Sequence, residues 1–195
     1  MQVEETILKG CYIITPKVFE DERGYFFESF NAATFKKLTG IEPHFVQDNQ
    51  SYSTYGVLRG LHLQIGDSAQ AKLVSVLSGK VWDVAVDLRP DSTTFKKYIS
   101  IELSAENKKQ LYIPRGFAHG FVTLTASASF FYKCDNYYNK SAERSIIYND
   151  PQLNIQWPLP EKELILAQKD LANLTLETFM QQASSLKPQA ISYKY

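Results

Sequence analysis

The chain has 195 residues, 44% of them hydrophobic and 22% charged, and its 21 basic residues equal its 21 acidic ones. This length predicts one globular domain, residues 1–195, with a core that needs no disulfide or metal to fold. The zero net charge argues against a nucleic-acid binder, because no basic excess is available to displace counterions from a polyphosphate. Cys11 and Cys134 lie far apart, which excludes zinc-finger spacing and a disulfide framework, so we expect two reduced thiols.

The N-terminal segment, MQVEETILKG, has acidic residues where a signal peptide has basic ones. No apolar run in the chain approaches the ~20 residues of a transmembrane helix. We therefore expect a cytoplasmic protein that binds no membrane. Residues 185–195 are expected to form a loosely ordered C-terminal tail or to pair with a neighbouring molecule.

A short helix over 31–40 is the first predicted element. Asn31 is a suitable N-cap, and Gly40 lies just past the last turn, where a left-handed residue commonly ends a helix. The rest of the chain is mostly β in composition, because aromatic residues make up 13% of it and fall within short segments rich in Val, Ile and Thr. Helices are therefore expected to be few and peripheral.

The predicted strands follow one another with frequent turns between them. After AKLVSVLSG (71–79) comes the clearest strand, KVWDVAVDL (80–88), whose alternation places Asp83 and Asp87 on one face that we expect to be exposed to solvent. Further strands are predicted over 95–104, 110–114, 117–125, 127–138 and 145–148, before a second helix over 174–184. This pattern predicts an all-β fold, an antiparallel sandwich or barrel.

Three histidines are candidates for chemistry. His62 and His119 each lie near glycines, which within a strand commonly mark a bulge or the close approach of a ligand. Taken alone, each is better explained as a core histidine bonded to a carbonyl. His44 follows a proline and is expected at the surface or in packing. A zinc site is not favoured, because Gln64 and not a second histidine follows His62 at the next alternate position, although a site built from distant residues stays open.

Lys72 and Tyr132 also lie in strand segments with apolar neighbours. Lys72 is near the start of its strand, where it either presents a localised cation to an oxyanion or extends to solvent. In SASFFYKCDNYY, Tyr132 shares its parity with Phe130 and Cys134, which predicts that one such set of side chains faces the interior. A tyrosine in such a place is ordinarily a packing residue.

In their order along the chain, these segments resemble the cupin-type dTDP-4-dehydrorhamnose 3,5-epimerase family. The likeness runs through FEDERGYFFESF (19–30), FVQDNQSYSTYGVLRGLHLQ (45–64), AKLVSVLSGKVWDVAVDLR (71–89), QLYIPRGFAHGF (110–121), FYKCDNYYN (131–139), YNDPQLNIQWP (148–158) and LAQKD (166–170). No single fragment is specific, but the ordered set covers nearly the whole chain. The resemblance implies a jelly-roll barrel or sandwich, usually a homodimer, that binds a nucleotide sugar without a metal or organic cofactor.

The resemblance also implies catalytic roles. His62 matches the family's general base, and Asp170 matches the carboxylate partner that orients the imidazole. Lys72 falls where the family stabilises an enolate oxygen, and Tyr132 matches the acid that returns a proton from the opposite face of the sugar. Epimerising a carbon beside a ketone needs such a base, an enolate partner and an acid, and it needs no redox cofactor.

By the same resemblance, the contacts to the nucleotide sugar fall on Arg23, Phe26, Glu28, Gln47, Asn49, Arg59, His119, Tyr138, Glu143 and Lys169. Arginine side chains suit the oxygens of a diphosphate. Some of the family's nucleotide contacts cross the dimer interface. The implied activity is epimerisation of dTDP-4-dehydro-6-deoxy-D-glucose at C3 and C5, giving dTDP-4-dehydro-L-rhamnose for polysaccharide synthesis.

Alternatives stay open at this point. Lys140 stands where the family commonly has proline, Ala167 stands where it has the serine of Ser-x-Lys-Asp, and Tyr148 replaces the tryptophan of its Trp-Asn-Asp. These departures leave room for a single-position epimerase, or for one acting on another dTDP- or CDP-linked 4-keto-deoxysugar. A non-catalytic jelly-roll module that binds a carbohydrate or nucleotide, and a metal-dependent cupin oxygenase, are the alternatives of other classes.

Overall fold

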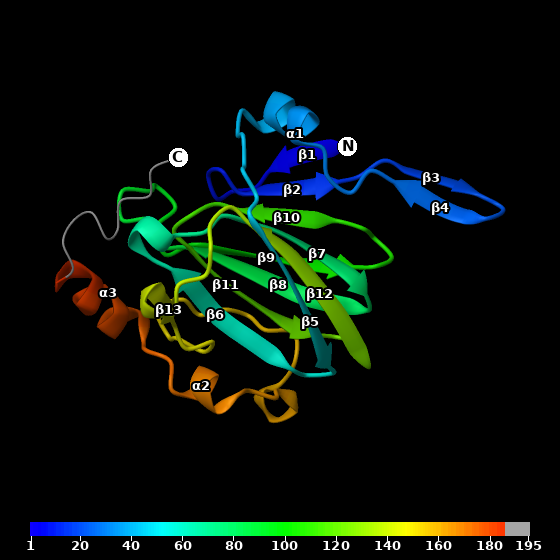
Figure 1. Ribbon diagram of the computed structural model, residues 1–195. Helices are drawn as coiled ribbons and strands as arrows, with labels where there is room; N and C mark the ends of the chain where they lie inside the picture. The colour runs from blue at the N-terminus through cyan, green and yellow to red at the C-terminus, as the bar shows by residue number, and fades with distance from the viewer. Residues whose placement is uncertain (186–195) are drawn as a thin grey trace.

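Two antiparallel β-sheets dominate the computed structural model, which describes residues 1–185 (Figure 1). The first sheet has six strands, in the order β1 (Gln2–Glu5), β2 (Tyr12–Thr15), β10 (Gln110–Ile113), β7 (Lys72–Ser78), β12 (Ser127–Cys134) and β5 (Gln47–Thr54). The second has five strands, in the order β13 (Glu143–Ser145), β6 (Leu58–Gln64), β11 (Phe117–Thr123), β8 (Lys80–Asp87) and β9 (Tyr98–Ser104). The predicted all-β jelly roll with few short helices is confirmed, as a sandwich and not a closed barrel.

Apolar side chains from both sheets form the core between them. Strands β7, β10 and β12 of the six-stranded sheet and β8, β9 and β11 of the five-stranded sheet contribute to one cluster, which includes Val74, Leu111, Phe130, Ala85, Leu103 and Phe121. These side chains are at most 4% exposed. Burying each of the larger ones contributes about 1.5–3 kcal/mol to folding, which offsets the cost of ordering the strands.

The outer face of the five-stranded sheet is buried as well. Val84 and Val86 of β8 lie in a second cluster with residues of helix α3 (Leu176–Ser185). Because that face is covered, the other face of β8 points into the sandwich, and Asp83 and Asp87 are both 0% exposed. The prediction of a solvent-exposed face was therefore wrong: alternation separates two faces of a strand, but it does not tell which face another element covers.

The two buried aspartates have different partners. Asp87 accepts hydrogen bonds from the guanidinium of Arg89, with Nε at 2.8 Å and Nη2 at 2.7 Å from its carboxylate oxygens. Asp83 lies 2.9 Å from the ring Nε2 of His119. Each of these buried carboxyl groups thus has at least one polar partner, as buried polar groups require.

The predicted helices are confirmed near their predicted bounds. Helix α1 (Ala32–Thr39) begins after Asn31, whose side-chain oxygen accepts from the backbone N–H of Thr34, and it ends at Gly40, which has a φ of +75°. Phe35 of this helix is 0% exposed and packs on the outer side of the six-stranded sheet. The remaining helical segments are η1 (Gly66–Ser68), η2 (Lys140–Ala142), η3 (Glu161–Glu163) and the one-turn helix α2 (Gln168–Leu171).

A separate hairpin of β3 (Val18–Asp21) and β4 (Gly24–Phe27) extends away from both sheets (Figure 1). Three aromatic side chains on it are exposed to solvent: Phe19 by 53%, Tyr25 by 60% and Phe26 by 71%.

Within residues 1–185, no helix has the length and apolar character needed to cross a membrane. The expected C-terminal tail lies outside the described residues.

Candidate active site

A cavity of about 530 Å³ lies between the two sheets, a size that suits a small-molecule ligand. Strands β5, β6, β7, β11, β12 and β13 line it, together with the segment 165–170. Its polar lining consists of Asn49, Gln50, Ser51, Arg59, His62, Lys72, His119, Tyr132, Glu143, Lys169 and Asp170. The site thus draws on both sheets and on the chain that follows the last strand.

The close approach of β6 and β11 sets the position of two histidines. A Cβ atom on Gly60 would lie 2.6 Å from Cα of Gly120, so that only glycine fits where the strands meet. The ladder is irregular beside this point, between His119 and Phe121, and His62 stands directly opposite His119. Of the two expectations for these glycines, a bulge or the close approach of a ligand, the bulge is confirmed.

His62 forms a pair with Asp170, which comes from helix α2. His62 Nε2 lies 2.6 Å from Asp170 Oδ1, and the two side chains are 25% and 3% exposed. With its Nε2–H donated to the carboxylate, the imidazole has its other nitrogen free to accept a proton. Leu61 and Leu63, which flank His62 in β6, are buried on the opposite side of the strand. Their burial directs the histidine into the cavity.

Lys72 and Tyr132 enter the cavity from the other sheet. Lys72 begins β7, and its Nζ lies 5.6 Å from the centre of the Tyr132 ring in β12. Burial lowers the pKa of Lys72 below its ordinary value and raises the pKa of Tyr132. Burial therefore favours the protonated form of Tyr132, which lines the cavity from the sheet opposite the one that carries His62.

His119 has a carboxylate partner of its own in Asp83. The buried Asp83 carboxylate accepts through Oδ2, while its Oδ1 has no hydrogen-bond partner within residues 1–185. The ring of His119 also stacks on Phe130 at 5.8 Å between centroids. Alternation in β8 predicts that Asp83 is exposed to solvent, so its pairing with His119 was not expected from the sequence.

Known proteins resemble this chain over most of its length. A family model described as dTDP-4-dehydrorhamnose 3,5-epimerase matches residues 5–178. A curated protein of that name from Salmonella typhimurium is 54% identical over 175 residues, which cover 88% of this chain and 93% of the relative.

The chain belongs to the dTDP-4-dehydrorhamnose 3,5-epimerase family.

Two solved structures of proteins with related names are also similar to this chain. A dTDP-4-dehydrorhamnose 3,5-epimerase from Elizabethkingia anophelis is 60% identical, with a TM-score of 0.89, over 91% of this chain and 97% of the other. A dTDP-6-deoxy-D-glucose-3,5-epimerase from Legionella pneumophila, in complex with dTDP-4-keto-L-rhamnose, is 48% identical, with a TM-score of 0.87, over 100% and 98% of the two chains.

Nine of the fourteen residues expected at the epimerase site line the cavity: His62, Lys72, Tyr132, Asp170, Asn49, Arg59, His119, Glu143 and Lys169. These residues are spread from 49 to 170 in the sequence. Strand pairing and the segment 165–170 bring them to one place. Arg59 is anchored at the mouth, where its Nε donates to Ser53 Oγ at 3.0 Å. Among the described residues, no group of three or more His, Cys, Asp or Glu side chains is arranged to hold a metal ion.

Gln47 and Tyr138 lie beside the cavity and are hydrogen-bonded to residues that line it. Gln47 Nε2 donates to Asn49 Oδ1 at 3.0 Å, and the backbone N–H of Tyr138 donates to Gln47 Oε1 at 3.0 Å. The Tyr138 hydroxyl donates to Glu143 at 3.0 Å, which raises the pKa of this tyrosine. The two side chains extend the polar wall outward from the cavity.

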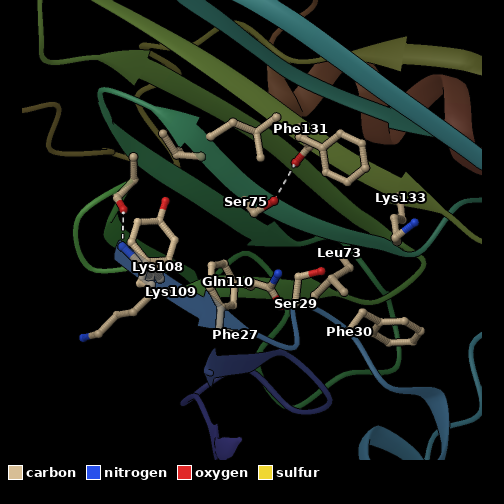
Figure 2. Close-up of a pocket in the computed structure, with 14 residues that line it drawn as sticks. Phe27, Ser29, Phe30, Leu73, Ser75, Lys108, Lys109, Gln110, Phe131 and Lys133 are labelled. Atoms are coloured by element: carbon tan, nitrogen blue, oxygen red, sulfur yellow. Dashed lines mark hydrogen bonds between the residues drawn. The ribbon is translucent and has the colours of Figure 1, made fainter. Parts of the chain in front are cut away.

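Arg23, Phe26 and Glu28 do not reach the cavity of their own chain. They lie on or just after the β3–β4 hairpin, and the Arg23 side chain, 84% exposed, pairs with Asp21. At the base of the hairpin is a second, smaller pocket of about 150 Å³ (Figure 2). Aromatic and lysine side chains line this pocket, including Phe27, Phe30, Phe131, Lys108 and Lys133, and none of the fourteen expected site residues does.

Proposed function

We propose that this chain is an isomerase that converts dTDP-4-dehydro-6-deoxy-D-glucose to dTDP-4-dehydro-L-rhamnose, by inverting C3 and C5 beside the C4 ketone. The observation that carries the proposal is the placement of the His62–Asp170 pair on one sheet and of Lys72 and Tyr132 on the other, around one cavity. The family match and the Legionella complex support the substrate class. The product serves dTDP-L-rhamnose and polysaccharide synthesis.

The proposed mechanism uses these four side chains in sequence. His62 takes a proton from the carbon beside the ketone, and Asp170 stabilises the imidazolium that forms. The electron pair of the broken C–H bond moves to the ketone oxygen, where the Lys72 cation stabilises the enolate. The enolate then takes a proton from Tyr132 on the opposite face, so that the configuration inverts. No electrons leave the sugar, and the reaction needs no cofactor.

The nucleotide diphosphate is proposed to lie at the polar mouth of the cavity. Arg59 and Lys169 supply positive charge there, and an arginine fork matches phosphate oxygens. Side chains with amide, carboxylate, imidazole and phenol groups surround the rest of the nucleotide sugar: Gln47, Asn49, Glu143, His119 and Tyr138. We also propose a cytoplasmic location, because nucleotide sugars are made and used there, and we expect binding to neither nucleic acid nor membrane.

Deuterium exchange tests the epimerisation itself. Proton NMR should follow dTDP-4-dehydro-6-deoxy-D-glucose incubated with the protein in deuterated water without added metal. We expect deuterium at both C3 and C5, because each inversion breaks one C–H bond and returns a proton from a group that exchanges with solvent. Deuterium at one carbon would show a single-position epimerase. Binding without exchange would show another 4-keto sugar substrate or a non-catalytic module.

We further propose that the enzyme is a homodimer in which Arg23, Phe26 and Glu28 serve the cavity of the partner subunit. Their exposure on a hairpin that leaves the body of the chain supports this arrangement. Exposed aromatic side chains on such a projection are typical of a surface that packs against another molecule.

Mixed dimers test this exchange of residues between subunits. Arg23→Ala and His62→Asn proteins should each be nearly inactive, because each lacks one required group in every site. After mixing and subunit exchange, about a quarter of the sites should be intact, since random pairing makes half of the dimers mixed and one site in each has both groups. Sedimentation velocity should show the dimer. An inactive mixture of verified mixed dimers would contradict the proposal, because it would place both residues in one site.

A further inference from the structure

Asp170 lies on an arch, residues 165–174, whose two ends pair with residues directly next to strands β6 and β13 of the five-stranded sheet. At the first end, Ile165 forms a parallel bridge with Val57, with Ile165 N–H donating to Gly56 O at 2.8 Å. At the second end, Leu174 forms a parallel bridge with Ile146. Figure 1 shows the arch in orange beside β6, on the side where α2 lies.

Both attachment points belong to the chain around His62. Val57 immediately precedes β6, and Ile146 exchanges two backbone hydrogen bonds with Leu61, at 2.9 and 3.1 Å. His62 lies in β6, and the arch that carries Asp170 is therefore joined at both ends to residues next to β6 or bonded to it. A displacement of the arch would move Asp170 relative to His62, from which it now lies 2.6 Å away.

The helix that carries Asp170 is too short to fix its own position. Helix α2 has four residues, and a single helical turn is unstable in water because the cost of nucleation is not recovered. Asp170 is nevertheless 2% exposed. Its place against His62 is therefore set by contacts outside the helix, which include the two bridges at the ends of the arch and Asn173 Nδ2 donating to Gly60 O at 3.4 Å.

The first bridge depends on two residues that precede β6, Tyr55 and Gly56. Gly56 has a φ of +77°, and a Cβ atom there would lie 2.2 Å from the carbonyl oxygen of Glu163. Tyr55 donates its hydroxyl to the Glu163 carboxylate at 2.6 Å. Because Gly56 has no side chain, its backbone comes close to the backbone of Glu163. Tyr55 also holds Glu163, by its hydrogen bond to the Glu163 side chain.

We propose that Tyr55 and Gly56 are positioning residues for the epimerase: they hold the start of the arch so that Asp170 meets His62. This inference rests on the proposed function. Neither residue lines the cavity. They act on the reaction only through the placement of the arch, since the arch supplies Asp170 and Lys169 to the site.

Gly56→Ala tests the proposal, with Gly40→Ala as its matched control. Gly40 has nearly the same φ, +75°, but a Cβ atom there would meet nothing within 4 Å. Both variants therefore place alanine at a similar left-handed φ, and only Gly56→Ala also crowds Glu163. We expect Gly56→Ala to lower kcat about 10- to 100-fold, because a shift near 1 Å misplaces a catalytic group, and Gly40→Ala to stay within about 2-fold of the parent.

A double-mutant cycle of Gly56→Ala with Asp170→Asn distinguishes a positioning effect on kcat from a general loss of structure. If the glycine acts through Asp170, adding Gly56→Ala to an Asp170→Asn protein should change kcat less than about 3-fold, while it changes the parent enzyme at least 10-fold. Equal losses in both backgrounds would overturn the proposal. Thermal unfolding of all four proteins shows whether each is folded at the assay temperature.

Tyr55→Phe gives a second test if Gly56→Ala does not fold. It removes one hydroxyl and adds no strain, so we expect a loss of kcat of about 3-fold that disappears in the Asp170→Asn background. An unchanged kcat in Tyr55→Phe would overturn the role of the tyrosine. Failure of the proposed function is distinguishable, because the parent and Gly40→Ala proteins would then show no exchange at C3 or C5.

Discussion

His62→Asn is expected to abolish deuterium incorporation at C3 and at C5 and to reduce turnover by about 10⁴-fold, the upper end of what general acid–base catalysis contributes. Asparagine keeps a hydrogen-bond donor near Asp170, but it offers no nitrogen that accepts a proton near neutral pH. One base serves both carbons in the proposed mechanism, so both exchange signals should disappear together. The measurement is proton NMR of the 4-dehydro sugar in deuterated water.

Tyr132→Phe is the matched variant for this experiment. It removes only the hydroxyl of the proposed acid and leaves His62, Asp170 and Lys72 in place. Exchange with solvent should therefore survive better than productive inversion, since His62 still removes and returns protons on its own face. Near-normal exchange in His62→Asn would assign the base elsewhere, and parallel loss of exchange and inversion in Tyr132→Phe would contradict its role as the acid.

Lys72→Met is expected to lower kcat by about 10³-fold, because it removes the cation beside the enolate oxygen in a water-poor cavity. Methionine occupies a similar volume without a charge. The loss should be largest below the lowered pKa of Lys72, where its ammonium group is charged. Because burial lowers the pKa of Lys72, the parent enzyme should lose activity at alkaline pH below the ordinary lysine value of 10.5, and the variant should lack this loss.

The same substitution is expected to stabilise the fold. A lysine whose pKa is lowered in the folded state favours the unfolded state below that pKa, where the buried ammonium is charged. Stability then rises with pH between the lowered pKa and 10.5, where the unfolded chain also loses its proton. Lys72→Met removes this penalty, so its Tm at pH 7 should rise by about 2–4 °C for each kcal/mol gained.

Lys97→Met is the control for both effects, because Lys97 is exposed on the loop before β9 and does not line the cavity. Its activity and its pH profile should match those of the parent. An active Lys72→Met enzyme, within 10-fold of the parent, would contradict the oxyanion role. A lower Tm in that variant would show that the ammonium is stabilised by its surroundings and not penalised by burial.

Local sequence patterns predicted the secondary structure well where the signals were short in range. The cap at Asn31 and the glycine at Gly40 set the bounds of α1 because capping depends only on neighbouring residues. Alternation predicted β8 and the division of β12 into two faces, and the structure shows that the face with Phe130, Tyr132 and Cys134 points inward.

The predicted solvent-exposed face of β8 was wrong because alternation carries no information on what covers each face. The contacts of α3, about 90 residues later, help to bury the apolar face of β8, so that Asp83 points toward His119. Asp83 therefore had no recognisable signal as a site residue in the sequence. A buried acidic residue on an alternating strand is detectable only once both covering layers are known.

The sequence by itself determined an all-β chain, the family it belongs to and the residue types that the chemistry needs. Only the tertiary structure decided which of them meet, because the His62–Asp170 contact joins residues 108 positions apart through the arch and the cross-sheet placement of Lys72 and Tyr132 depends on strand order. Strand pairing and the packing of two sheets act between distant segments, so local patterns do not encode these distances. The same reason places Arg23, Phe26 and Glu28 away from the cavity of their own chain.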